Sequence, residues 1–439
     1  MDHVPQKFSE KVLSFIKVKD RDLILAEITN WTPTMWFAAR FTAQAHGIGP
    51  HLNVIFNDYQ LFQILDNNFH RYIQDQYVQN KKRISRIQEI LHTLLSKAND
   101  QNIPLMPLKG SILINDYYSD PAIRPMADID LLIYPEDYDR LDRLLESMQF
   151  HPFDSFDDGV YSNVHHLVSI DGEHPDNPIK IEMSHRVGWP IGRLEFDITE
   201  LIWENAEKGF LGYDCAYKPT QERLLLMLIC HNAGNQFNGK MRAFQLYDIS
   251  LVSKRMNAQQ WSNLKTIVKE NQLQRIVFPV LAMAKRFTDI EVPDGLIEEQ
   301  KLHTPHALKH HVQNQSVDSL IASNDYKLLN LKLNERSHKK NRNVLKIYQP
   351  FFITIVQAMQ LQWLFPGKEK RQQLKHNFSL STYKKDREGN LTSYILYYRL
   401  LLPIVFFPVL VIGEKQRSVL LGKLRLSLIK NLFESTETA

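Results

Sequence analysis

Apolar positions recur at helical spacing through the first hundred residues. In the stretch that ends near residue 98, six of them interrupt a charged background: Ile84, Ile87, Ile90, Leu91, Leu94 and Leu95. Positions three and four apart share one face of a helix, so this stretch predicts an amphipathic helix. The polar run at residues 99–102 and Pro104 end the pattern. Residues 1–98 are therefore predicted to form a helical N-terminal region.

The pattern then changes to short apolar runs separated by turn residues. Proline and acidic residues at 135–137 suit the first turn of a helix, where a backbone N–H needs no partner and negative charge is favoured. These apolar runs and turn residues predict a strand at 103–108, a helix at 111–118, a loop at 119–127, a strand at 128–134 and a helix at 135–148.

Two more strands are predicted at 164–170 and 179–185. In the second, apolar Ile179, Ile181 and Met183 alternate with polar residues, which places Glu182 on the polar face of a half-buried strand. After about residue 215 the spacing is helical again. The chain is predicted to be α+β, with a small mixed sheet of four or five strands within about residues 100–190 and large helical regions on both sides. The predicted domains are 1–98, a core at 99–212 and a helical domain at 213–439.

Chemistry-bearing side chains gather in the predicted core. Alternate residues of a strand share a face, so Asp128 and Asp130 point two carboxylates at one spot while Ile129 points into the core. The turn Lys109-Gly110-Ser111 lies upstream, between a predicted strand and helix. Carboxylates beside a phosphate-binding turn are how proteins hold Mg²⁺ on a nucleoside triphosphate. Each motif is weak alone, but their order predicts nucleotidyltransferase-type chemistry.

Composition narrows the class of protein. The chain has 439 residues, of which 44% are apolar, enough to build hydrophobic cores. Cys215 and Cys230 are the only cysteines, which excludes a disulfide framework and a cysteine-rich zinc site. The first twenty residues contain no apolar segment of the signal-peptide type, so a cytoplasmic location is expected.

Charge is unevenly distributed along the chain. Residues 301–439 carry 22 Lys and Arg against 9 Asp and Glu, whereas the rest of the chain is net acidic. This basic C-terminal region indicates either an anionic partner or a solvated helical domain. It includes the apolar run 400–412, which is too short to span a bilayer and predicts a buried segment or, less readily, a peripheral membrane contact. No nucleic-acid-binding module is recognisable.

Residues 103–185 resemble the DNA-polymerase-β-type nucleotidyltransferase superfamily and, more closely, a bacterial family of uncharacterised nucleotidyltransferases. The motifs that carry the resemblance are Leu108-Lys109-Gly110, Arg124-Pro125 before Asp128-Ile129-Asp130, Pro135-Glu136-Asp137 and Glu182-Met183-Ser184-His185. A weaker match surrounds His231 and Asp248. Two departures are a longer spacing from Gly110-Ser111 to the acidic pair, and Glu182 where an Asp is more usual.

The resemblance implies transfer of NMP from an NTP, such as ATP, to a hydroxyl or phosphate of a small-molecule, peptide or sugar acceptor. Asp128 and Asp130 would bind Mg²⁺, or Mn²⁺, together with the triphosphate. Glu182 would complete the second metal site, where the acceptor hydroxyl loses its proton and attacks the α-phosphate.

The same resemblance assigns the phosphate contacts. Gly110 and Ser111 would offer backbone N–H groups and a hydroxyl to the β- and γ-phosphates, and Lys109 would add a positive charge. Arg124 would neutralise charge in the transition state. For Lys109 and Arg124 the alternative is an ion pair with a nearby acid.

The histidines leave several alternatives open. His165 and His166 would face opposite sides of a strand, which argues against a zinc site with Glu182. His185 could position the acceptor only if the strand bends. His231 either packs within a helix or approaches the nucleotide from the C-terminal domain.

Two other classes of function share these features. A metal-dependent glycosyltransferase could use the same acidic pair to hold a nucleotide-sugar, and a non-catalytic nucleotide-binding or interaction protein could use the helical regions to hold a partner. Binding of NTPs and nucleotide-sugars with and without Mg²⁺ would separate these classes from a nucleotidyltransferase.

Overall fold

The computed structural model describes residues 7–152, 164–169, 179–191, 194–237, 240–304 and 306–321. The chain divides into two compact units. The first consists of Met1–Trp189 and Phe196–Lys327, and the second of Pro190–Glu195 and Leu328–Ala439. Nearly all of the second unit, including the apolar run 400–412, lies outside the described residues. The domain boundaries expected from the sequence stay a prediction.

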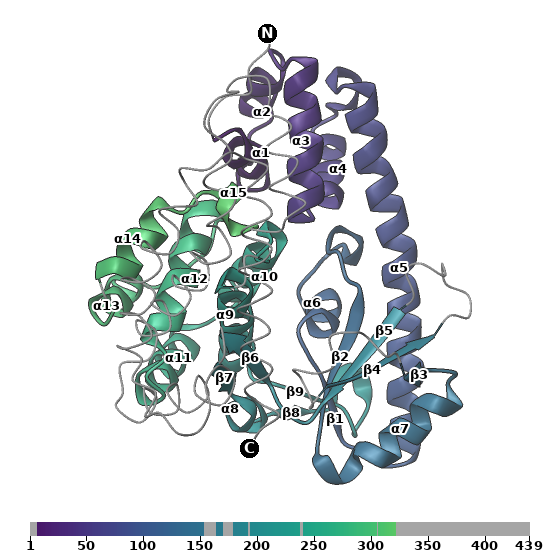
Figure 1. The fold of residues 1–439 in the computed structure, drawn as a ribbon. Coiled ribbons are helices and arrows are strands. Elements are labelled where there is room, and N and C mark those ends of the chain that lie inside the picture. Colours follow the sequence, from purple (N-terminus) through teal and green to yellow (C-terminus); the bar gives the residue numbers. More distant parts are fainter. Residues whose placement is uncertain are drawn as a thin grey trace, which may run out of the picture. The chain divides into compact units, whose positions relative to one another are not determined.

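The first unit begins with five helices (Figure 1). They are α1 (Phe8–Lys17), α2 (Arg21–Ile28), α3 (Pro33–His46), α4 (Gly49–Asp58) and, after the 3₁₀ turn η1 (Phe62–Ile64), α5 (Asn67–Asp100). The carboxylate of Asp66 accepts hydrogen bonds from the first N–H groups of α5, which fixes where this long helix starts. The apolar stripe predicted on α5 is buried, and the helix ends at the polar run that the sequence marks.

A five-stranded mixed sheet follows, as the sequence predicts. Its strands are β1 (Leu105–Pro107), β2 (Asp128–Ile133), β3 (His151–Pro152), β4 (Val164–Ser169) and β5 (Ile179–Ser184), in the order β1-β2-β5-β4-β3. β2 and β5 are parallel, and their register pairs Asp130 with Glu182. The other pairs are antiparallel. This register brings the third predicted acid next to the acidic pair.

Short helices connect the strands and cover the sheet (Figure 1). They are α6 (Gly110–Asp116), the 3₁₀ turns η2 (Pro121–Ile123) and η3 (Pro135–Asp137), and α7 (Tyr138–Ser147). α6 packs on β2, and α5 contacts β2, α7 and η2. The loop before β2 is therefore held between the sheet and the N-terminal helical region.

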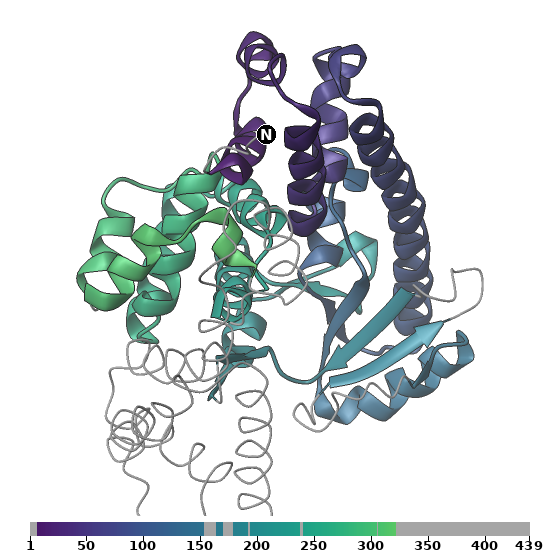
Figure 2. The same cartoon turned by 45° about the horizontal axis from the view of Figure 1, so that its top comes forward.

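The chain then returns to helices, as predicted (Figure 2). After two small two-stranded ribbons and α8 (Thr199–Trp203), the helices are α9 (Gln221–Phe237), α10 (Ala243–Ser253), α11 (Ala258–Glu270), α12 (Gln274–Phe287), α13 (Leu296–Leu302), α14 (His306–Asn314) and α15 (Val317–Leu320). One ribbon pairs β6 (Gly188–Ile191) with β7 (Leu194–Asp197). The other pairs β8 (Glu207–Lys208) with β9 (Tyr217–Lys218), and η4 (Phe210–Gly212) lies between these two strands in the chain. α9 packs against α10, α11 and α12. Among the described helices, none has the length and apolar content needed to cross a bilayer.

Two buried histidines, His46 and His51, should make the fold sensitive to acid. Burial lowers the pKa of each imidazole from 6.5 to about 4. The unfolded chain then binds more protons than the folded chain between these values, so the free energy of unfolding falls as pH drops from about 6.5 to 4. The expected loss is about 3 kcal/mol for each histidine.

Urea unfolding between pH 4.5 and 7.5 measures this loss, and His51→Gln should flatten the pH dependence. His92→Gln, at an exposed position of α5, is the matched control and should leave the slope unchanged. Equal slopes in the wild type and the His51 variant would contradict the assignment.

Candidate active site

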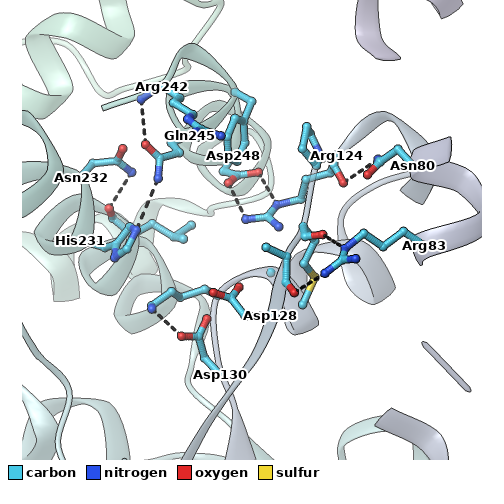
Figure 3. Close-up of a pocket in the computed structure, with 17 residues that line it drawn as sticks. Asn80, Arg83, Arg124, Asp128, Asp130, His231, Asn232, Arg242, Gln245 and Asp248 are labelled. Atoms are coloured by element: carbon cyan, nitrogen blue, oxygen red, sulfur yellow. Dashed lines mark hydrogen bonds and ion pairs between the residues drawn. The ribbon is translucent and has the colours of Figure 1, made fainter. Parts of the chain in front are cut away.

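A cavity of about 340 Å³ lies between the sheet and helices α5, α9 and α10 (Figure 3). Its wall brings together six residues singled out from the sequence, together with others from the helical regions. The lining residues are Asn80, Arg83, Lys109, Gly110, Arg124, Pro125, Met126, Ala127, Asp128, Asp130, Leu228, His231, Asn232, Arg242, Phe244, Gln245 and Asp248.

Asp128, Asp130 and Glu182 form an acidic cluster on the neighbouring strands β2 and β5. Asp128 and Asp130 line the cavity, whereas Glu182 lies beside Asp130 on β5 and does not line it. Burial, with the charge of Asp130, raises the pKa of Asp128 to about 6. Burial also raises the pKa of Glu182 to about 8, and the two aspartates add to the effect. Burial would raise the pKa of Asp130, but Lys109 outweighs burial there and lowers the pKa of that carboxyl. The three groups would therefore repel one another if all were ionised, and at neutral pH Glu182 holds its proton.

The donor chemistry of this cluster fits a hard divalent cation. Carboxylate oxygens are preferred ligands of Mg²⁺, and burial beside Asp130 raises the pKa of Asp128 and of Glu182, so a cation bound there would stabilise their ionised forms. In the part of the chain that the structure describes, no group of three or more His, Cys, Asp and Glu side chains is arranged to hold a metal ion. The candidate cation site is thus the pair Asp128 and Asp130. A site in which Glu182 is a third ligand stays a prediction.

The ammonium of Lys109 lies against the carboxylate of Asp130, where a metal cation would compete with it. Its Nζ lies 2.7 Å from Oδ1 of Asp130. Burial lowers the pKa of Lys109, but Asp130, Glu182 and Asp128 more than offset this, so the pKa is raised overall. Its backbone has φ 44° and ψ −112°, a conformation that non-glycine residues rarely adopt. A strained lysine at the turn into α6, facing an acidic pair, is typical of a functional position.

Arg124 forms a buried ion pair with Asp248 of α10. Its Nε and Nη2 donate to the two carboxylate oxygens at 2.9 and 3.0 Å. The hydroxyl of Tyr118 donates to the same carboxylate at 2.7 Å. The ion-pair alternative considered for Arg124 is therefore present, and it ties the loop before β2 to the helical domain.

Gly110 lies at the start of α6, but the reason for a glycine there differs from the expected one. A Cβ on Gly110 would lie 2.6 Å from Nη1 of Arg124 and 2.9 Å from the sulfur of Met126. Both distances are shorter than side chains tolerate. A Cβ at this position would force Arg124 or Met126 to move, so the close approach of these two side chains, and not only room for phosphate, favours a glycine.

Ser111 is the predicted phosphate contact that the structure does not place in the cavity. Its side chain is fully buried and absent from the lining, and its N–H donates to the carbonyl of Leu108 at 3.1 Å. The expected role of its hydroxyl and N–H in binding phosphates is not supported by this position.

The histidines differ in their relation to the cavity. His231 lines it, and burial lowers its pKa to about 3, with the charge of Lys109 adding to the effect. Its Nε2 lies 2.9 Å from Nδ2 of Asn235 and 3.4 Å from Nε2 of Gln245. Because both amides donate to Nε2, the neutral ring carries its proton on Nδ1 and can act as a donor. His185 follows β5 and does not line the cavity, and the side chains of His165 and His166 lie outside the described residues.

Three side chains of α5 hold the loop before Asp128, and sequence reasoning missed them. Tyr77 donates to the Asp120 carboxylate at 2.9 Å. Asn80 donates to the carbonyls of residues 122 and 124, and Arg83 to those of residues 126 and 127, at 2.6 to 3.0 Å. Polar residues at every third position were the available signal, but the neighbouring lysines made this face of α5 resemble an ordinary solvated surface.

Replacing Arg83 by Met should loosen this loop. The change keeps the aliphatic stem and removes the donors to residues 126 and 127, so we expect a loss of about 1–3 kcal/mol in the free energy of unfolding. Urea unfolding measures it. Arg86→Met is the matched control, because Arg86 lies one turn away in an exposed ion pair with Glu89 and should cost at most about 1 kcal/mol. Equal small losses would show that the loop does not depend on Arg83.

The mixed sheet, the paired aspartates and the adjoining cavity agree with the nucleotidyltransferase class that the sequence predicts. The profile of the family described as "uncharacterised nucleotidyltransferase" matches residues 33–289, so the chain belongs to that family. The matched range contains every residue that lines the cavity. No curated protein and no solved structure matches the chain.

Proposed function

We propose that the protein is a Mg²⁺-dependent nucleotidyltransferase that moves NMP from an NTP to a hydroxyl or phosphate of a small-molecule, peptide or sugar acceptor. The observation that carries the proposal is the pair Asp128 and Asp130 on one face of β2, lining a cavity whose other walls carry basic side chains. Family membership supports nucleotide transfer in general. The proposal further includes Mg²⁺ as the metal, with Mn²⁺ as a substitute. It also includes the class of acceptor and a cytoplasmic location.

The acidic cluster would hold the metal ion, which would supply charge neutralisation to the triphosphate when bound. Asp128 and Asp130 are the proposed ligands. Glu182 adjoins Asp130, and with a pKa of about 8 it holds its proton at neutral pH until a cation binds; losing that proton would then add a negative charge beside the metal. A cation at Asp130 would release Lys109 from its ion pair, so that its ammonium could turn to the phosphates.

The remaining roles follow from position. Gly110 allows Arg124 to approach the cavity wall, and Nη1 of Arg124 is the nitrogen that the Asp248 pair leaves for transition-state charge. His231 keeps its proposed contact with the nucleotide or the acceptor as a residue of the cavity wall. Ser111 is assigned to the packing of α6. His185 keeps its proposed acceptor role only if the acceptor extends beyond the cavity.

Incubation of the full chain with each NTP labelled at the α-phosphate, Mg²⁺ and a small-molecule cell extract tests the proposal. We expect pyrophosphate release with transfer of the label to an acceptor, and no transfer by Asp130→Asn. Transfer of sugar from a nucleotide-sugar in parallel reactions would favour glycosyl transfer instead. Metal-dependent binding without turnover of any substrate would favour the non-catalytic reading.

A further inference from the structure

Arg242 stands at the start of α10 and lines the cavity from the helical side, across from Asp128 and Asp130 (Figure 3). Its backbone N–H donates to Oε1 of Gln245 at 2.9 Å, which fixes the residue at the helix terminus. Gln245 in turn contacts His231. The start of α10 is therefore tied to the same set of side chains that surrounds the acidic pair.

The cavity is lined by four cationic side chains, and three of them are already engaged. Lys109 is paired with Asp130, and Arg124 with Asp248. Arg83 donates to two backbone carbonyls. Within the described residues, the guanidinium of Arg242 forms no ion pair, and its side chain is exposed. Among the described residues, therefore, no carboxylate competes with an entering anion for the guanidinium of Arg242.

The position of Arg242 adds a second source of positive potential. α10 is 11 residues long, and the aligned peptide dipoles place partial positive charge at its first turn. A guanidinium and helix N–H groups at one place make a site suited to a phosphate group, to which arginine can donate in a fork. The cavity volume of about 340 Å³ is within the range of roughly 300–1,000 Å³ typical of small-ligand sites.

We propose that Arg242 binds the β- and γ-phosphates of the NTP, so that the triphosphate reaches from the acidic pair on β2 to the start of α10. This inference rests on the proposed function. The phosphate tail is favoured over an anionic acceptor because the α-phosphate must lie at the metal-binding carboxylates. The tail then extends into the same cavity, where Arg124 stays paired with Asp248 and Lys109 is paired with Asp130 until a metal takes its place.

Calorimetric titration of the full chain with ATP, GTP, CTP and UTP, and with the corresponding monophosphates, in Mg²⁺ tests the inference. For Arg242→Gln, affinity for the bound NTP should fall roughly tenfold to a hundredfold, and affinity for the monophosphate should change less than about twofold. Arg242→Lys should keep most of the NTP affinity. Arg143→Gln, which removes an equal charge at an exposed position of α7, is the control.

Each outcome decides a different point. If the wild type binds no NTP with Mg²⁺ or Mn²⁺, the proposed function fails and the inference fails with it. If the wild type binds NTP and Arg242→Gln binds it equally, only the inference is overturned. An unchanged NTP affinity with a raised KM for an acceptor would assign Arg242 to the acceptor's anion and also overturn it. Circular dichroism verifies that the variants are folded.

Discussion

Asp128→Asn is expected to reduce nucleotide transfer by about a thousandfold or more while making the metal-free fold more stable. The loss follows because an amide cannot replace an anionic metal ligand. The gain follows because Asp128 has a folded-state pKa of about 6, raised from 3.8 by burial and by Asp130. An ionised Asp128 therefore costs stability in the absence of metal.

The stability that Asp128→Asn gains over the wild type should increase with pH. A carboxyl whose pKa is higher in the folded state penalises folding as pH rises from about 4 to 6, and the penalty is constant above that range. The stability difference between Asp128→Asn and the wild type should thus appear across this window and reach about 1–3 kcal/mol at pH 8.

Urea unfolding in a chelator at pH 4 and pH 8 measures this difference. Asp139→Asn, at an exposed position of α7, is the control and should change neither stability nor turnover. Near-normal turnover in Asp128→Asn would exclude a metal held by the acidic pair. A lower stability at pH 8 would show that the carboxylates do not repel one another as described.

Arg124→Met should cost about 3–5 kcal/mol in the free energy of unfolding, because it leaves the buried carboxylate of Asp248 without its cation. Among the described residues, only the hydroxyl of Tyr118 would still donate to that carboxylate. Replacing both members of a buried ion pair by apolar residues is often nearly neutral, so Arg124→Met with Asp248→Leu should recover most of the loss. Chemical unfolding of the two single variants and the double variant measures the effect.

The double variant also separates the two roles of Arg124. If it folds stably but transfers nucleotide slowly, Arg124 acts on the reaction as well as on the fold. If it restores turnover along with stability, Arg124 is structural alone. A single Arg124→Met variant within about 1 kcal/mol of the wild type would mean that the pair is not buried as the structure shows.

The main elements of the fold were predictable because their patterns are local and long. α5 shows its apolar stripe over many turns, and β5 alternates strictly between buried and half-buried positions. β3, β6, β7, β8 and β9 contain two to four residues each, too few to show a period. Their pairing depends on tertiary contacts that the sequence does not display.

The candidate site was predictable only where neighbours in sequence decide the geometry. The shared face of Asp128 and Asp130 follows from strand alternation, and Gly110 follows from the strand–helix junction. The partner of Arg124 lies 124 positions away on α10, and the donors to residues 122–127 come from α5. Such contacts depend on how helices pack, so neither Arg83 nor Arg242 could be assigned from spacing. Glu182 is the register partner of Asp130 but does not line the cavity, so its part in the site stays a prediction.

The metal dependence of NTP binding decides whether Asp128 and Asp130 form a metal–nucleotide site. The full chain, the Asp128→Asn variant and the Asp130→Asn variant would each be titrated with the four NTPs in Mg²⁺, in Mn²⁺ and in a chelator. We expect the wild type to bind at least one NTP only when the metal is present, and we expect both variants to lose this binding. NTP binding of equal strength with and without metal, or unchanged in the two variants, would contradict a metal–nucleotide site at Asp128 and Asp130.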